Sequence, residues 1–153
     1  MTSAAGKRKA QEVDAAGNLT KATEPNPAGG TWDTLYVYND RNMLLTVTMT
    51  RPPGTQTRTF TYNIAGQVLT STNPENGTVT STYDGTTGLL SSKLDARNGK
   101  VSYVYDSLKR VKEIHRWVGT VEQYDQRVNL YYDSNPFDAS YGTNLTGRLA
   151  VTE

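Results

Sequence analysis

The sequence predicts an all-β fold: an antiparallel array of β-hairpins with about 11 or 12 strands, twisted and curved. Three observations lead to this prediction. One motif occurs twice, and every matched pair of residues lies 22 positions apart. Each copy opens with Asn-Gly, at Asn76-Gly77 and at Asn98-Gly99, and continues into a run rich in Thr, Val and Tyr. Self-similarity at a period of about 20–50 residues indicates stacked supersecondary units rather than one enclosed globule.

The two Asn-Gly pairs are predicted to be the tips of hairpins. Asn-Gly between two β-forming runs favours a type I′ turn, which needs a positive φ at both central residues. Both residues of each pair are therefore expected to have a positive φ. The runs that follow, residues 78–83 and 100–105, are predicted strands because Thr, Val and Tyr favour extended backbone. One repeat then consists of two short strands and two tight turns.

Each of these two strands ends in Tyr followed by Asp. Because successive side chains of a strand point to opposite faces, Tyr83 and Tyr105 end the more apolar face of their strands. Asp84 and Asp106 come next, and an Asp at that position is well placed to accept backbone N–H groups in an Asx turn. A polar turn and a new apolar run follow. The Tyr-Asp pair therefore predicts the junction between one strand and the next.

The rest of the chain repeats this pattern with variations. Residues 1–10 include Lys7-Arg8-Lys9 and are expected to be frayed. Before the two Asn-Gly copies, the predicted elements are a degenerate repeat at 13–19, a loop at 24–30, a strand at 32–38, a run at 45–50 that alternates apolar and Thr side chains, a turn at 51–54 and a repeat copy at 60–69. After them come a turn at Gly119, a strand at 121–132, an expanded loop at 133–147 and a strand that restarts at Gly147-Arg148-Leu149. The whole chain, residues 1–153, is predicted to be a single array of about six repeats.

The composition is typical of a thin sheet. Hydrophobic residues make up 35% of the chain and the mean hydropathy is −0.63, so both sheet faces are expected to be only partly buried. Ten tyrosines suit such a surface, because tyrosine covers apolar area while keeping a polar tip. A net charge of +1 and the lack of a long apolar run predict no nucleic-acid and no membrane partner. The chain has no cysteine, which excludes disulfides.

The recurring tyrosines carry a family resemblance. Tyr-Asp, a short turn, Gly, one residue and Leu, at a period near 22, resembles the YD repeat of the RHS family. The resemblance covers nearly the whole chain, and its last copy is most similar to the family's Gly-Arg-Leu form. The signature residues are Tyr38, Tyr62, Tyr83, Asp84, Gly88, Tyr105, Asp106, Tyr132, Asp133, Gly147, Arg148 and Leu149.

This resemblance implies a function. In the RHS family, bacterial polymorphic toxins, insecticidal toxin-complex subunits and animal teneurins wind many repeats into a hollow β-shell, which in the toxins encloses a toxic C-terminal domain. This chain has fewer repeats and lacks the self-cleaving segment that ends the toxin shells. It therefore resembles a piece of a shell wall, or a very short relative. The resemblance implies a non-catalytic wall segment, without cofactor, of a secreted or cell-surface protein that encloses a toxin or another polypeptide.

Sharper functions have less support. The aspartates of the repeats (14, 40, 84, 106 and 133) offer one carboxylate each, whereas a cation site needs several oxygen donors on one ion, so no metal is predicted. His115 is the only histidine and is expected to be structural, so no catalytic residue is predicted. Glu113 and Glu122 could face each other across strands as a glycosidase pair requires. Tyr-rich strands could also stack on sugar rings, so a carbohydrate- or surface-binding module is the alternative function and an enzyme is the third.

Open sheet edges predict self-association. About six repeats are too few to close a shell, so edge strands would present unpaired N–H and C=O groups to another chain. The expected partners are further RHS repeats or a second copy of this chain, most simply in a two-fold dimer. An enclosed polypeptide is the other expected partner.

Overall fold

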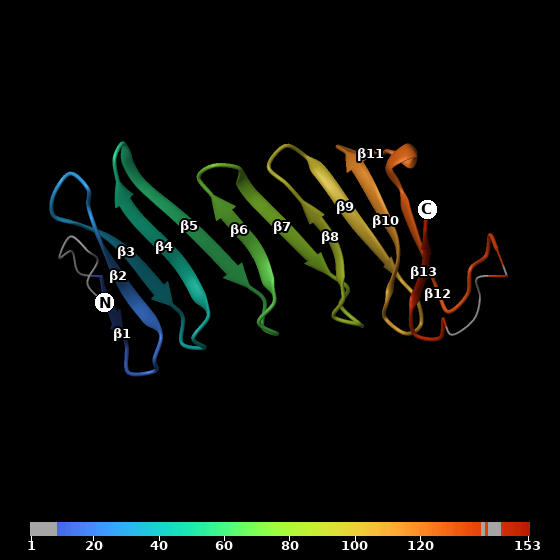
Figure 1. Ribbon diagram of the computed structural model, residues 1–153, viewed down its shortest axis with the longest axis horizontal. Coiled ribbons are helices and arrows are strands. Elements are labelled where there is room, and N and C mark those ends of the chain that lie inside the picture. Colours follow the sequence, from blue (N-terminus) through green and yellow to red (C-terminus); the bar gives the residue numbers. More distant parts are fainter. Residues whose placement is uncertain (1–8, 139, 141–144) are drawn as a thin grey trace. The chain divides into compact units, whose positions relative to one another are not determined.

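The computed structural model describes residues 9–138, 140 and 145–153. It divides into two units, Met1–Thr78 and Val79–Glu153, and each is described by itself. The described residues form thirteen strands and one short 3-10 helix, and every strand pair is antiparallel (Figure 1). The all-β prediction is confirmed, with one or two strands more than expected. The single array of about six repeats over 1–153 stays a prediction.

The first unit is a meander of strands joined by short turns. Each strand pairs with the next along the chain (Figure 1). The strands are β1 (Ala10–Val13), β2 (Leu19–Pro25), β3 (Thr31–Tyr38), β4 (Leu44–Arg51), β5 (Gly54–Tyr62) and β6 (Val68–Asn73). Of the stretch 1–10 that is expected to be frayed, residues 1–8 lie outside the described residues and Ala10 begins β1.

The second unit follows the same plan with one interruption. Its strands are β7 (Gly77–Tyr83), which begins just before the unit, β8 (Leu90–Leu94), β9 (Gly99–Tyr105), β10 (Val111–Val118), β11 (Val121–Glu122), β12 (Val128–Tyr132) and β13 (Leu149–Thr152). The prediction of one strand over 121–132 is wrong. The 3-10 helix η1 (Tyr124–Gln126) separates β11 from β12, and β10 pairs with both of them. Within the expanded loop 133–147, residues 139 and 141–144 lie outside the described residues.

No apolar side chain is fully buried in the described part of the chain. The only buried residues there are Thr34 and Ser81, which are polar. Each unit is thus a sheet without an enclosed core, which confirms the expectation of two partly buried faces. Such a sheet depends on contacts between neighbouring strands, because side-chain pairs across strands are its main stabilising unit.

The alternation predicted for residues 45–50 is found in β4. Thr46 pairs with Thr59 and Thr48 pairs with Thr57, so threonine faces threonine across β4 and β5. On the opposite face Val47 pairs with Arg58. One face of these two strands is therefore built from β-branched hydroxyl side chains, which suit an extended and half-exposed surface.

Candidate functional site

The residue after each recurring tyrosine organises a turn. In the turn that begins at Asp106, the backbone N–H of Asp106 donates to the carbonyl of Arg110 at 2.9 Å, and the N–H of Lys109 donates to the carbonyl of Asp106 at 3.0 Å. Asp106 Oδ1 also accepts the backbone N–H groups of Leu108 and Arg110, each at 2.9 Å. This is the Asx turn that the sequence predicts.

The same turn recurs at six places, which we call the Tyr-Asp turns. They begin at Asp14, Asn39, Asn63, Asp84, Asp106 and Asp133. In the second of them Asn39, not Asp40, accepts the backbone N–H groups, because the side chain must come directly after Tyr38. The fourth has one additional residue, and Gly88 closes it with a φ of 71°.

The sixth Tyr-Asp turn keeps its closure in spite of the expanded loop. The N–H of Gly147 donates to Asp133 Oδ1 at 2.7 Å, and the N–H of Asp133 donates to the carbonyl of Arg148 at 3.2 Å. Gly147 has a φ of 77°, and Leu149 begins β13 two residues later. The turn is therefore assembled from residues that are far apart in the sequence.

These hydrogen bonds stabilise the ionised carboxylates. The side-chain amide and backbone N–H of Asn18 lower the pKa of Asp14, and the backbone N–H of Thr87 lowers that of Asp84. The backbone N–H of Arg110 is the main cause of the lowered pKa of Asp106. A carboxylate that accepts several N–H groups is favoured in its charged form. The aspartates are thus occupied as turn acceptors.

A shift in strand register accompanies every Tyr-Asp turn. In the second turn Val37 pairs with Thr46 but Tyr38 pairs with Leu44, so one residue of β4 is left over. Such a bulge bends the strand and changes the direction of nearby side chains. The residue before each turn pairs across the bulge with the first residue of the next strand: Val13 with Leu19, Tyr38 with Leu44, Tyr62 with Val68, Tyr83 with Leu90, Tyr105 with Val111 and Tyr132 with Leu149.

Two of the tyrosines form hydrogen bonds between neighbouring repeats. The hydroxyl of Tyr62 donates to the backbone carbonyl of Leu44 at 2.8 Å, and that of Tyr105 donates to the carbonyl of Leu90 at 2.8 Å. Leu44 and Leu90 each begin a strand just after the preceding Tyr-Asp turn. The tyrosine therefore supplies a donor to a carbonyl beyond the end of the paired ladder, where buried polar groups need a partner.

Polar side chains also connect consecutive Tyr-Asp turns within a unit. In the first unit, Asn18 Nδ2 donates to Asn42 Oδ1 at 2.8 Å and Arg41 Nη1 donates to the carbonyl of Ile64 at 2.7 Å. In the second unit, Arg110 connects Asp106 to Asp133. Its Nε lies 2.7 Å from Asp106 Oδ2, and its Nη1 and Nη2 lie 3.1 and 2.7 Å from the two Asp133 oxygens.

The Arg110 guanidinium completes its site with an aromatic contact. Its Cζ lies 4.3 Å from the centroid of the Tyr132 ring, a cation–π arrangement. Its hydrogen bonds are the main cause of the lowered pKa of Asp133, which is about 2. Arg suits this position because its planar fork matches a carboxylate bidentately.

The two Asn-Gly pairs differ from the prediction. At the first, the positive φ belongs to Gly77 at 75°, and at the second it belongs to Asn98 at 63°. Neither Asn76 nor Gly99 is among the described residues with positive φ. The type I′ prediction is therefore wrong at both. The second pair belongs to a turn that begins at Asp95 and has the Asx pattern, in which Asn98 takes the left-handed position.

This second set of Asx turns was not predicted. Asp95 Oδ1 accepts the N–H groups of Arg97 and Gly99 at 2.8 Å, and Asn26 Oδ1 accepts that of Ala28 at 2.9 Å. These turns lie at the opposite ends of the strands from the Tyr-Asp turns. A spacing in the sequence could have revealed them: an Asp or Asn is followed, three positions later, by Asn or Gly. The turn at Asp14 has the same spacing.

Grooves lie between consecutive Tyr-Asp turns. One of about 410 Å³ lies in the first unit between the turns at Asn39 and Asn63, and one of about 440 Å³ lies in the second unit between those at Asp84 and Asp106. Equivalent repeat positions line both, with Phe60 and Tyr62 in the first and Tyr103 and Tyr105 in the second. The second groove thus combines aromatic rings with carboxylates.

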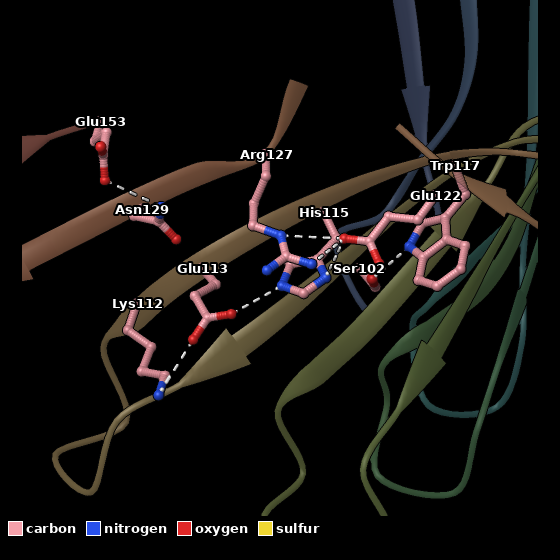
Figure 2. A network of polar contacts seen from close by, with 9 residues as sticks. All are labelled: Ser102, Lys112, Glu113, His115, Trp117, Glu122, Arg127, Asn129 and Glu153. Atoms are coloured by element: carbon pink, nitrogen blue, oxygen red, sulfur yellow. Dashed lines mark hydrogen bonds and ion pairs between the residues drawn. The ribbon is translucent and has the colours of Figure 1, made fainter. Parts of the chain in front are cut away.

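The one histidine lies in a separate charged cluster, which Figure 2 shows on and beside β10. His115 Nε2 lies 3.0 Å from Glu113 Oε2, and His115 Nδ1 lies 2.9 Å from Glu122 Oε1. Arg127 Nη2 and Nε also donate to Glu122 Oε1, at 2.6 and 3.1 Å. The His115 side chain is 15% exposed and that of Glu122 is 8% exposed. The His115 side chain is therefore largely enclosed and not a surface residue.

The cluster does not provide a free acid and base. Glu113 contacts Lys112 at 3.2 Å as well as His115, and these contacts lower its pKa, the hydrogen bond from His115 most of all. Glu122 is held by Arg127 and His115. A glycosidase acid needs a raised pKa, so Glu113 lacks the property required of one. In the described part of the chain, no group of three or more acidic or histidine side chains could hold a metal ion.

Comparison with known proteins identifies the fold. No family profile and no curated protein matches the sequence. Among solved structures, the chain is similar to one in the crystal structure of TcdB2-TccC3-Cdc42, with a TM-score of 0.67 and 18% identity over 82% of this chain and 6% of that chain. One in the crystal structure of TcdB2-TccC3-TEV has a TM-score of 0.45 and 12% identity over 97% of this chain and 10% of that chain. In the described residues no helix has the length and apolar character to cross a membrane.

The first of these likenesses confirms the fold expected from the Tyr-Asp repeat. The neighbouring chains come from toxin complexes that contain RHS repeats. The sheet with its Tyr-Asp turns has the RHS-repeat fold. This chain spans only a small fraction of their length.

Proposed function

We propose that this chain is a non-catalytic wall segment of an RHS-type shell that encloses a polypeptide. The observation that carries the proposal is the recurrence of one turn, with its register shift, at six places along sheets that have no buried apolar core. An enzyme or a compact binding domain surrounds its site with buried structure. A wall instead needs a repeated unit that extends in one direction, each unit contacting its neighbours.

The use of the tyrosine hydroxyls supports the wall function. Tyr62 and Tyr105 direct their hydroxyls to backbone carbonyls of the preceding repeat. The Arg110 bridge adds a contact between consecutive turns of the second unit. These groups connect consecutive repeats along the array, as a wall built from stacked repeats requires.

The proposed partners follow from the two outermost strands. Among the described residues β1 pairs only with β2, and β13 pairs only with β12. An unpaired strand edge is a template for another strand. We assign further RHS repeats, or a second copy of the chain, to these edges and a polypeptide cargo to the enclosed space. The parent protein is proposed to be secreted or displayed on the cell surface, which cell fractionation tests.

Protease protection tests the enclosing role. The polypeptide that carries this chain in its native cells is purified with an antibody against the Tyr-Asp turns, imaged by electron microscopy and digested with protease. The expected result is a hollow particle in which an internal segment resists digestion until denaturant opens the wall. The isolated chain serves as the control without contents. A solid or extended particle whose segments are all digested at one rate would exclude a shell.

A carbohydrate-binding function is the second candidate. The groove between the turns at Asp84 and Asp106 favours it, because Tyr103 and Tyr105 could stack on a sugar ring while hydroxyls and carboxylates bind its edges. An NMR titration with simple oligosaccharides tests it, with Tyr103→Ala as the variant. Saturable shifts of the groove residues that vanish in this variant would favour binding, and unchanged spectra at high sugar concentration would exclude it for the sugars used.

A further inference from the structure

His115 lies where strand β10 changes its partner. β10 pairs with β12 up to Ile114, which faces Val128, and it pairs with β11 from Trp117, which faces Glu122. Between β11 and β12 the chain leaves the ladder through the 3-10 helix η1. We call residues 123–127 the excursion. The backbone N–H of Gln123 still donates to the carbonyl of Arg116 at 2.8 Å, so His115 lies beside the point where the excursion leaves β10.

The two ends of the excursion are joined by an ion pair. Glu122 immediately precedes it and Arg127 ends it, and Arg127 donates twice to Glu122 Oε1, at 2.6 and 3.1 Å. The Nδ1 atom of His115 lies 2.9 Å from the same oxygen. The ring thereby fastens this closed pair to β10. Because the Glu122 side chain is 8% exposed, water screens these contacts little.

The two contacts of the ring are both favourable only when each nitrogen carries a proton. Nδ1 faces a carboxylate oxygen of Glu122 and Nε2 faces one of Glu113. An ionised carboxylate only accepts hydrogen bonds, so each ring nitrogen must carry hydrogen to bond there, and only the imidazolium has hydrogen on both. A neutral ring would place a nitrogen lone pair about 3 Å from a carboxylate oxygen, and that contact must open.

The surrounding groups do not replace the missing proton. On β10, Lys112 contacts the other oxygen of Glu113, and Arg127 holds Glu122 from the far end of the excursion. Across from His115 on β9 stands Ser102, an uncharged residue whose hydroxyl accepts the indole N–H of Trp117. On β12 the residue opposite Glu113 is the neutral Asn129, which contacts Glu153. Arg116 follows His115 on β10. Both glutamates therefore keep a cationic partner, Lys112 or Arg127, when the ring loses its proton.

We propose that His115 is a protonation-dependent latch whose imidazolium fastens the excursion to β10, and whose loss of a proton loosens residues 121–128. Histidine is the side chain that ordinarily changes charge between pH 5 and 8. The latch is closed while the ring carries both protons and is loosened when it has lost one. The device would make one turn of the wall responsive to the acidity around it.

The single histidine makes the test specific. Because the chain has one histidine, a side-chain titration in this interval is assigned to His115. Nitrogen-15 NMR of the whole chain reports the protonation of both ring nitrogens directly. Hydrogen exchange, corrected for the intrinsic pH dependence of exchange, reports the opening of residues 121–128. We expect the protection of residues 121–128 from hydrogen exchange to fall on the order of tenfold when the ring loses one of its two protons, as expected for a hydrogen bond to a charged group.

Two variants separate the latch from general stability. His115→Gln should abolish the pH dependence of protection at 121–128 between pH 5 and 8. Ser102→Ala removes the neighbouring Trp117 hydrogen bond and should change protection equally at all pH values. A ring with one unprotonated nitrogen at pH 5, or equal pH profiles for the wild type and His115→Gln, would overturn the proposal. The NMR measurement on the wild type decides the matter if a variant does not fold.

Discussion

The hydroxyl of Tyr62 donates a hydrogen bond to the backbone carbonyl of Leu44, 18 positions earlier in the sequence, at 2.8 Å. Tyr105 makes the equivalent contact with Leu90. In both cases a residue that ends one repeat binds the residue that restarts a strand after the preceding Tyr-Asp turn. The tyrosine of the repeat thus serves as a polar connection between repeats as well as an apolar covering.

This relationship predicts the effect of removing one oxygen atom. Tyr62→Phe and Tyr105→Phe should each lower the free energy of unfolding by about 1 kcal/mol, because a half-buried carbonyl loses its donor. Tyr36→Phe is the control, since the structure shows no hydrogen bond from that hydroxyl, and it should change stability by less than about 0.5 kcal/mol. Urea titrations measure all three. Equal effects at the three positions would mean that the hydroxyl bonds contribute nothing.

The Arg110 bridge predicts a dependence on acid. The pKa of Asp133 is lowered from its ordinary 3.8 to about 2 when the protein is folded. The contact therefore contributes stability that is fully present above about pH 4 and is lost as the pH falls toward 2. In Arg110→Met the pKa of the Asp133 carboxyl should rise toward its ordinary value, with the Gly147 N–H still lowering it. Carbon-13 NMR of the carboxyl groups measures this, with Arg97→Met as a control of equal charge change. An unchanged Asp133 titration in Arg110→Met would contradict the bridge.

Lys109 predicts a stabilising substitution. Its φ is 64°, in the position that Gly17, Gly66 and Gly88 occupy in other Tyr-Asp turns. A side chain with a β-carbon is strained there, so Lys109→Gly should stabilise the fold by about 0.5–1 kcal/mol. Lys109→Ala keeps the strain but removes the charged chain, and should give no such gain. Thermal unfolding of the two variants side by side separates backbone strain from loss of the charge.

Replacing the glycine of either Asn-Gly pair by alanine should destabilise the fold, but for a different reason in each pair. Gly77→Ala should cost about 1 kcal/mol because its φ is 75°. At Gly99 a β-carbon would lie 2.8 Å from Asp95 Oδ2, so Gly99→Ala must displace the side chain that holds the turn. In an Asp95→Ala background the cost of Gly99→Ala should nearly vanish, whereas that of Gly77→Ala should remain. A double-mutant cycle with additive energies at Asp95 and Gly99 would refute the steric explanation.

The open strand edges predict association in solution. Light scattering coupled to size exclusion should show a mass above 16.8 kDa that rises with concentration, most simply toward a dimer. The far-ultraviolet circular dichroism should stay β-rich throughout the dilution series. A constant monomer mass at every concentration would show that the edges of β1 and β13 do not recruit a second copy.

Local patterns in the sequence were enough for most of the strands and for one set of turns. Alternating Thr, Val and Tyr before Tyr83 and Tyr105 predicted β7 and β9, because strand formation depends on neighbouring side chains. The position of the left-handed residue was not predictable from Asn-Gly alone. Asn98 adopts it because Asp95, three residues earlier, fixes the turn.

The His115 cluster could not be predicted, because it depends on where the chain leaves the ladder. Glu113 lies two residues before His115 on β10, so the sequence alone indicates that these two side chains are neighbours on one face of the strand. Glu122 reaches the ring only because β11 pairs with β10 before η1 begins. The sequence 121–132 resembles one continuous strand, and no local signal marks the 3-10 turn within it. Predicting the cluster would therefore require knowing in advance that β11 pairs with β10.

The closure of the last Tyr-Asp turn shows how such a chain can acquire new segments. The backbone N–H of Asp133 donates to the carbonyl of Arg148, as that of Asp106 donates to the carbonyl of Arg110, although fourteen residues separate Asp133 from Arg148. Each doubling of a flexible loop costs only about 0.6 kcal/mol in closure entropy. Foreign sequence can therefore enter at a turn tip while the strands on either side keep their pairing. The turn tips are therefore positions where peptides could be inserted, by design or in evolution, without changing the pairing of the strands.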